Sequence, residues 1–488
     1  MKKLFQIYVA LTGVLLFTLT GIRLVQSWRH DSHLDHVAGV WVALALDLKH
    51  GLFYRAPFGP AGYGGTRFFP LYFCLQAAFM RAMSWRAAGY FLSAASLVLL
   101  LAGVYVLLRR LGVGHWLAAA AVLAVLAGTS VQDSLLTIRE DGMAAMLGVW
   151  GVTLCVGSEP SRRRISFAAL LFTLAFATKE TSFVAAAAVF LLFLIARRFR
   201  SAAQLLAATV AGYAFVLAAM YFASSGRAFA ALHLTLATGS GWQSLLYSPI
   251  TMEQTMHGYV AESTLFVLGL TALLVGRGRG LTLLPALWFL CSLAVALVIF
   301  SSEGTAGNHL IELHVAAVVL FAAWASEFQL PEIGIAALVA ACLLAWVELL
   351  GQHFSVDGVP ARAQLRQIAL AIGPAKKPIL SDNPMVPIIA GQQPYVLDAF
   401  MLRAIRESVP SFSDPLWLML RDRQFAAVVL IDNPDSEEGN DTYSNYHFGE
   451  DFIELMKQNY QFAGIVGTEY LYLPRPSEPR DTKSPETQ

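Results

Sequence analysis

The sequence predicts an all-α polytopic membrane protein of about eleven transmembrane helices, followed by a small C-terminal α/β domain. Of its 488 residues, 57% are hydrophobic and only 14% are charged, a balance that soluble domains do not have. The apolar residues form long runs up to about residue 350, and arginines gather in alternate connections between the runs. Beyond that point the composition is mixed and rich in proline, as expected for a separate domain outside the membrane.

The first predicted helix covers about residues 4–25 and follows Lys2 and Lys3. Its length suffices to span a bilayer and no A-x-A cleavage site follows, so we expect a retained helix with a cytoplasmic N-terminus. The other runs are centred near residues 98, 123, 150, 171, 189, 212, 267, 291, 317 and 341.

Arginines mark four of the short loops, at residues 109–110, 162–164, 197–200 and 277–279. The positive-inside rule places these loops in the cytoplasm. The remaining loops, including a long one at residues 26–87, and everything after residue 350 are then extracytoplasmic.

Two apolar segments have lengths that do not fit a single membrane span. A single helix over residues 165–196 would be about 48 Å long against a hydrocarbon core of about 30 Å, so we predict a break at Lys179-Glu180-Thr181. Residues 68–83 are short and contain Gln76 and Arg81, which favours an interfacial helix over a span.

The predicted domains are a membrane domain at residues 1–350, a soluble domain at 351–473 and a disordered tail at 474–488. Within the soluble domain, residues 426–431 are expected to form a buried strand and residues 451–460 an amphipathic helix.

The loop after the first helix carries three histidines and two carboxylates, His30, Asp31, His33, Asp35 and His36. His and Asp are competent metal ligands, but this spacing matches no zinc motif. The cluster is therefore a metal site, a solvated loop beside the membrane, or the source of a general base.

Two further clusters are expected at the same membrane face. Asp133 and residues 139–141 precede an apolar run. Their carboxylates either stabilise the N-terminus of the helix that follows or take part in chemistry. Lys179 lies at the membrane boundary, where an ionisable group is costly unless paired or functional. It is a candidate cation for a phosphate, with a structural pair with Glu180 or snorkelling as the alternative.

A fourth cluster covers residues 303–314 and contains Asn308, His309, Glu312 and His314. Glu312 and His314 fall inside an apolar run, and intramembrane ionisable groups are functional candidates. Together the four clusters predict carboxylates, cations and histidines around one outward cavity, which suits a phosphorylated lipid head group.

Five segments carry a family resemblance: "HGLFYR", "RFFPLYFCLQA", "TIREDGMAAMLG", "FATKETSFVAAAAVFLL" and "GNHLIELHVA". In this order, with an acidic residue in the first outer loop, the membrane region resembles the polyprenyl-phosphate-sugar-dependent membrane glycosyltransferases of the GT-C fold. That family includes protein O-mannosyltransferases and the lipid A aminoarabinose transferase.

The resemblance implies transfer of a sugar from a polyprenyl-phosphate donor to a hydroxyl on a glycan, lipid or protein acceptor, in the bacterial inner membrane and with inversion. Asp35 would be the general base. The other implied roles are phosphate binding by Lys179 and Arg139, orientation of an acceptor or metal by Asp141 and Asp31, and cavity lining by His36, Asn308, His309 and Glu312. No D-x-D motif is present, so the dependence on a divalent metal is left open.

The sequence fits other classes of function less well. A net charge of +1 without a basic and aromatic groove excludes nucleic acid as the expected partner. A transporter or lipid flippase is the strongest rival, because Glu312 and His314 lie within an apolar run. A non-catalytic partner or sensor is the third. The long outer loop and the one-sided polar clusters favour an enzyme.

Overall fold

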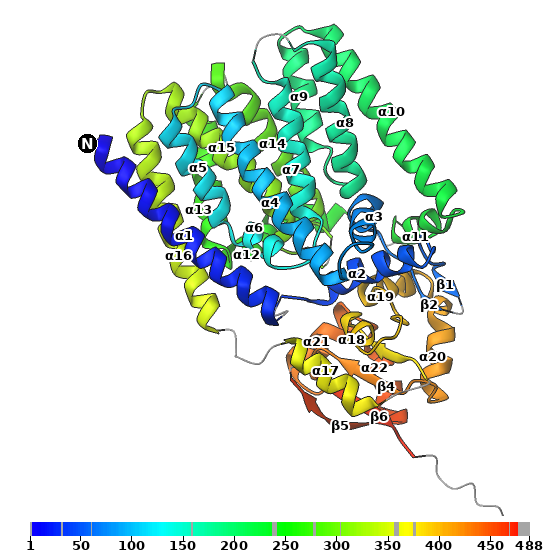
Figure 1. Cartoon of the computed structure of the whole chain (residues 1–488). Helices are drawn as coiled ribbons and strands as arrows, with labels where there is room; N and C mark the ends of the chain where they lie inside the picture. The colour runs from blue at the N-terminus through cyan, green and yellow to red at the C-terminus, as the bar shows by residue number, and fades with distance from the viewer. Residues whose placement is uncertain are drawn as a thin grey trace, which may run out of the picture.

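The computed structural model shows a helical bundle standing on a smaller α/β domain (Figure 1). The structure describes residues 2–30, 33–59, 61–157, 160–236, 242–276, 280–302, 304–355, 361–373, 377–467 and 469–476. The expectations on Asp31, on the arginines at residues 277–279 and on the tail beyond residue 476 lie outside these ranges.

All eleven apolar runs are helical. They correspond to α1 (Lys2–His30), α4 (Trp85–Arg110), α5 (His115–Ala127), α7 (Asp141–Cys155), α8 (Arg162–Thr178), α9 (Val184–Ile195), α10 (Phe199–Ala223), α13 (Val260–Val275), α14 (Leu283–Ile299), α15 (Ile311–Glu327) and α16 (Pro331–Ser355). Shorter connecting helices are η1 (Gly280–Thr282), η2 (Gly307–Leu310), α11 (Arg227–Leu236) and α12 (Trp242–His257).

Five helical segments of the described chain are long and apolar enough to span a membrane, and the bent pair α5 and α6 (Thr129–Leu136) makes a sixth. This confirms a multi-pass membrane protein, while eleven crossings stays a prediction. Large apolar side chains point outward from the bundle, such as Phe215 and Phe222 on α10, which are 72% and 76% exposed. Such surfaces are typical of contact with lipid.

Two helix breaks shape the polar end of the bundle. The first separates α8 from α9 at Lys179, as predicted. The second is a bend of 65° between α5 and α6 at Gly128. A Cβ at Gly128 would lie 2.7 Å from Nε2 of His314 and 3.1 Å from Oε1 of Glu262, so a larger residue at the bend would require these side chains to shift.

The loop after α1 folds into α2 (His36–Lys49), a hairpin of β1 (Phe58–Gly59) and β2 (Gly62–Tyr63), and α3 (Pro70–Phe79). At 10 residues, α3 is too short to cross a bilayer. The Trp41 ring of α2 stacks on Phe68 at 4.6 Å, beside α3.

The C-terminal domain contains a four-stranded mixed sheet in the order β3-β4-β6-β5. Only β3 and β4 are parallel; the other pairs are antiparallel. The strand expected at residues 426–431 is β4, and the helix expected at 451–460 is α22. The elements are α17 (Ala361–Ile372), β3 (Ile379–Ser381), α18 (Met385–Ile389), α19 (Ala399–Ser408), η3 (Pro410–Ser413), α20 (Asp414–Arg421), β4 (Ala427–Leu430), α21 (Glu437–Asn445), α22 (Glu450–Asn459), β5 (Tyr460–Val466) and β6 (Glu469–Pro474).

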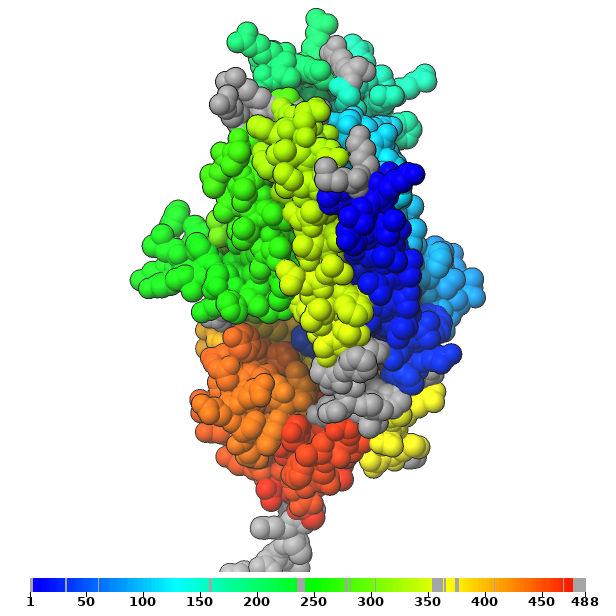
Figure 2. Space-filling model, turned by 90° about the vertical axis from the view of Figure 1, so that its left-hand side faces the viewer, coloured from blue at the N-terminus to red at the C-terminus, as the bar shows by residue number. Residues whose placement is uncertain are grey.

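The two parts meet at the polar end of the bundle. Helices α2 and α6 lie at the end that faces the C-terminal domain (Figure 1). On the face shown in Figure 2, α16 lies beside α1 above this domain, so the first and last long apolar helices are neighbours.

Candidate active site

An open cavity of about 360 Å³ lies at the polar end of the bundle. Its walls come from the loop before α2, from α6 and the loop that follows it, and from η2. The lining residues are His33, Leu34, Asp35, Asp133, Ser134, Thr137, Arg139, Tyr259, Ala306, Gly307 and Asn308.

Asp35 is held in this cavity by two contacts. It is the N-cap of α2, and its Oδ1 accepts a hydrogen bond from the backbone N–H of Ala38 at 2.8 Å. Aspartate is a preferred N-cap, and its charge suits the helix N-terminus. Its Oδ2 forms an ion pair with Arg139. The Asp35 side chain is 38% exposed, so a ligand in the cavity can reach it.

Both members of this pair are charged at neutral pH. Burial opposes ionisation of Asp35, but the Arg139 guanidinium, with smaller help from His36 and the Ala38 N–H, lowers the pKa of the carboxyl overall. Burial likewise opposes the charge on Arg139, and Asp35 outweighs it, so the pKa of Arg139 is raised. Asp35 is therefore an ionised but weak base while Arg139 is its partner.

A second ion pair lies deeper, around a small cavity of about 40 Å³. Lys179, at the break between α8 and α9, donates to Oδ1 of Asp141 at 2.5 Å. The same oxygen accepts from Nδ2 of Asn308 at 3.0 Å. Asp141 and Lys179 are only 3% and 8% exposed. Asn308 therefore bonds to the second ion pair and also lines both cavities.

The structure separates the other predicted cavity residues. His309 and Glu312 line the deeper cavity, where Glu312 accepts from Nε1 of Trp288 at 3.1 Å. His36 instead packs on His447 of the C-terminal domain, with ring centroids 5.2 Å apart. Asp31 lies outside the described residues.

Several buried polar atoms here have no hydrogen-bond partner among the described residues. They are Nε of Arg139, Oδ2 of Asp141 and Nδ1 of His309. A buried polar atom without a partner costs about 1–3 kcal/mol. Their concentration around two cavities that share Asn308 indicates a site built to receive polar groups of a ligand.

Sequence reasoning missed Arg67. Its guanidinium lies 5.6 Å from the ring centroid of Phe400 in α19, and its charge acts on His309 and Glu180 near the deeper cavity. Within the described chain it makes no hydrogen bond or ion pair, unlike Arg139 and Lys179. The available signal was its place at the start of the segment "RFFPLYFCLQA" in the first outer loop.

The histidines of the first loop do not assemble a metal site in the part of the chain that the structure describes. No group of three or more His, Cys, Asp or Glu side chains there is placed to hold a metal ion. Asp35, the carboxylate of this loop that lines the open cavity, is instead paired with Arg139.

Comparison with solved structures shows the fold. ArnT from Cupriavidus metallidurans matches in its apo state with a TM-score of 0.63 and 13% identity, covering 96% of this chain and 99% of that one. Its complex with undecaprenyl phosphate matches at a TM-score of 0.61 with the same identity and coverage. The archaeal oligosaccharyltransferase AglB from Archaeoglobus fulgidus, in complex with an inhibitory peptide and a dolichol-phosphate, matches at 0.54 and 14% identity, covering 98% of this chain and 75% of that one.

No protein-family model matches the sequence, and a search of curated proteins found no match. The likeness is therefore one of three-dimensional structure. It extends over nearly the whole chain and confirms the GT-C fold that the sequence predicted.

Proposed function

We propose that this GT-C-fold chain is an integral membrane glycosyltransferase, which moves a sugar from a polyprenyl-phosphate donor to an acceptor hydroxyl on the outer face of the membrane. One observation carries the proposal. A carboxylate and a guanidinium face an open cavity of about 360 Å³, directly beside a second, buried ion pair, at one end of a bundle with this fold. ArnT in this fold binds undecaprenyl phosphate, and AglB binds dolichol-phosphate.

The reaction proposed is a single displacement. The Asp35 carboxylate takes the proton of the acceptor hydroxyl, and the hydroxyl oxygen forms a bond to the anomeric carbon. The bond between that carbon and the phosphate oxygen breaks, and polyprenyl phosphate leaves with the electron pair. Attack from the face opposite the leaving group inverts the anomeric configuration.

Arg139 links donor binding to the basicity of Asp35. A donor phosphate in the cavity competes with Asp35 for the guanidinium, since both are anions that suit its fork of N–H donors. As Arg139 turns toward the phosphate, the pKa of Asp35 rises, because its strongest stabilising partner is shared. The carboxylate becomes a better base when the donor is in place.

The remaining cations stabilise the leaving phosphate. Arg67 forms no ion pair among the described residues, and Lys179 is paired with Asp141. Asp141 in turn accepts from Asn308, which lines the open cavity. In this proposal Asp141 orients Lys179 and Asn308, and positive charge close to the phosphate lowers the barrier to its departure.

A lipid flippase or transporter is the second candidate. Its supporting observation is the bend at Gly128, where a broken helix meets the buried ionisable residues Glu262 and His314. Glu262 accepts hydrogen bonds from the N–H and hydroxyl of Ser130, both at 2.7 Å. Broken helices near ionisable residues are typical of transporters.

The deciding experiment compares purified wild type, Asp35→Asn and the surface control Asp422→Asn. Each is incubated with a panel of polyprenyl-phosphate sugars and candidate acceptors, and release of polyprenyl phosphate is followed. We expect turnover in wild type and Asp422→Asn, with kcat about 10²- to 10⁴-fold lower in Asp35→Asn because the general base is lost.

Full turnover in Asp35→Asn would refute Asp35 as the base. Absence of turnover by wild type with every donor, together with movement of a fluorescent lipid between leaflets in proteoliposomes, would favour the flippase.

A further inference from the structure

Helix α2, which carries Asp35 at its N-cap, lies between the membrane bundle and the C-terminal domain. On the bundle side of α2, the Trp41 ring packs on the rings of Phe68 and of Tyr72 in α3, at centroid distances of 4.6 and 5.2 Å. The C-terminal domain touches the same helix at two places in its first turn and at one place in its last turn.

The first contact is between two histidine rings. His36, the first residue of α2, packs edge-on against His447, with the ring planes at 77°. His447 is only 5% exposed, and its Nδ1 lies 3.3 Å from Oδ2 of Asp382. The orientation of the His447 ring is thus set by a buried carboxylate of the C-terminal domain.

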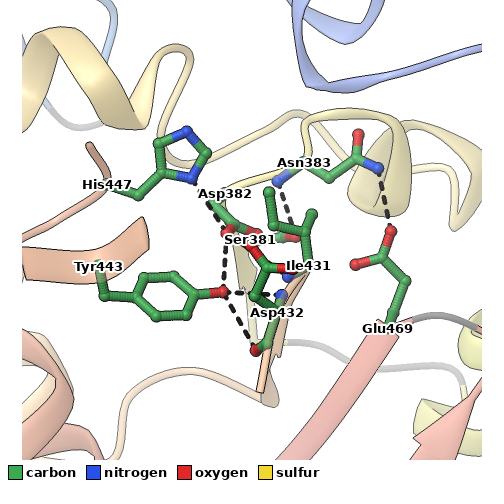
Figure 3. A network of polar contacts seen from close by, with 8 residues as sticks. All are labelled: Ser381, Asp382, Asn383, Ile431, Asp432, Tyr443, His447 and Glu469. Atoms are coloured by element: carbon green, nitrogen blue, oxygen red, sulfur yellow. Dashed lines mark hydrogen bonds and ion pairs between the residues drawn. The ribbon is translucent and has the colours of Figure 1, made fainter. Parts of the chain in front are cut away.

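Asp382 lies at one edge of the sheet, within a network of polar contacts (Figure 3). It follows β3, and its Oδ2 also accepts from the hydroxyl of Tyr443 at 3.1 Å and from the N–H of Ile431, just after β4, at 3.5 Å. The same tyrosine oxygen accepts from the N–H of Asp432 at 3.1 Å. This network connects the ends of β3 and β4 to helix α21.

The second contact is a close approach of backbones at Gly39. A Cβ at this position would lie 2.9 Å from the backbone nitrogen of Met385 and 3.1 Å from Pro384, at the start of α18. Backbone cannot move aside as the end of a flexible side chain can, so α2 and α18 fit together only with glycine at this position.

The third contact is a buried hydrogen-bonded cluster in the last turn of α2. Asp47 accepts from Arg55 at 2.6 and 2.9 Å and from Nε2 of Gln393 at 2.7 Å. Arg55 also donates to the carbonyl of Pro394 at 2.6 Å. Asp47 and Arg55 are 2% and 3% exposed.

We infer that the C-terminal domain positions Asp35 by holding α2 at these three contacts, with His447, Gly39 and Gln393 as positioning residues. The inference rests on the proposed function. A helix moves as a rigid unit, and Asp35 is bonded to its first turn. A shift of α2 therefore moves the carboxylate relative to Arg139 and the bound acceptor. Misplacement by about 1 Å can cost on the order of 100-fold in rate.

The test uses the full-length protein carrying His447→Ala, Gly39→Ala or Gln393→Ala. We expect kcat for polyprenyl-phosphate release to fall about 10- to 100-fold, with the KM for the donor within about twofold of wild type. Hydrogen exchange at residues 36–49 should rise, with exchange in α8 and α10 unchanged.

Matched controls are His257→Ala, at a histidine that is 85% exposed, and Gly21→Ala, where an added Cβ meets no atom within 4 Å. Both should behave as wild type. If one of the three variants does not fold, the other two still carry the test.

Two results would overturn the inference: unchanged hydrogen exchange in α2, or a raised donor KM with an unchanged kcat. If wild type releases no polyprenyl phosphate at all, the proposed function fails instead. The exchange measurement then still decides whether the C-terminal domain holds α2.

Discussion

The polar end of the bundle and the polar edge of the C-terminal sheet both gather carboxyl groups, but they balance the charge differently. In the bundle, Asp35 is paired with Arg139 and Asp141 with Lys179. At the sheet edge, the described contacts of Asp382 and Glu469 include no lysine or arginine; hydroxyl, amide and imidazole groups take that place.

The ionisation of Glu469 follows from that difference. Burial, with a further contribution from the nearby Asp382, raises the pKa of Glu469 to about 8, so the group is largely neutral at pH 7. Hydrogen bonds dominate at the sheet edge and fix geometry, whereas the bundle holds ionised groups and cations that a phosphate can recruit. The sheet edge therefore suits positioning, and the polar end of the bundle suits chemistry.

The largest expected effect comes from the buried pair of the bundle. Lys179→Gln leaves the Asp141 carboxylate buried without its cation, and should lower the free energy of unfolding by about 3–5 kcal/mol. Thermal unfolding in detergent measures this. The double variant with Asp141→Asn should recover much of the loss. The exposed pair of Lys457 and Asp435 is the control, and Lys457→Gln should cost less than about 1 kcal/mol. Equal losses in the two lysine variants would remove the distinction between buried and exposed pairs.

Substitution of Arg139, in contrast to Lys179, should lower activity and leave stability almost unchanged. Its partner Asp35 is 38% exposed, so Arg139→Gln lets water solvate the carboxylate and should change stability by no more than about 1 kcal/mol. Turnover should fall about 100-fold, because a group that stabilises the leaving phosphate is gone. Steady-state kinetics and unfolding of the same preparation test both parts. A stability loss as large as that of Lys179→Gln would mean that the pair is structural.

The smallest expected effect concerns pH. Because the folded-state pKa of Glu469 is raised to about 8, the stability linked to its protonation is fully present below the unfolded value of 4.5 and is lost as pH rises through 8. Glu469→Gln cannot ionise and can still accept from Asn383. Its melting temperature should match wild type near pH 4.5 and exceed it by a few degrees at pH 8.

The pH dependence linked to Asp35 has the opposite sign. Its folded-state pKa is lowered from 3.8, so its contribution is present above that value and is lost as pH falls. A Glu469→Gln variant with the same pH profile as wild type would contradict the distinction between the two regions.

The sequence was sufficient to predict the helices, because lipid solvent requires long apolar runs with internally bonded backbones. It also predicted the break at Lys179, since residues 165–196 are too long for one span. It also named Asp35, Arg139, Asp141 and Lys179 as candidate site residues, in three different clusters along the chain. It did not predict which groups pair, because Asp35 and Arg139 are 104 residues apart and meet only through tertiary packing.

The contacts that hold α2 could not be predicted from the sequence for the same reason. Arg55 and Pro394 are 339 residues apart, and neither carries a local signal for the contact. Gly39 looks like an ordinary small residue in an apolar stretch, yet it lies where the backbone of Met385 leaves no room for a Cβ. The interpretation of His36 as a cavity residue used only its closeness in sequence to Asp35, whereas its ring packs on the C-terminal domain.

The neighbouring positions of α1 and α16 have a consequence for how the protein is made. Helix α1 ends at His30 and α16 begins at Pro331, roughly 300 residues later in synthesis. At about 5–20 residues per second, α1 waits roughly 15–60 s in the membrane before its neighbour emerges. The C-terminal domain that contacts α2 follows later still. A ribosome that stops before that point leaves a chain whose helices are inserted but whose Asp35 lacks its final support.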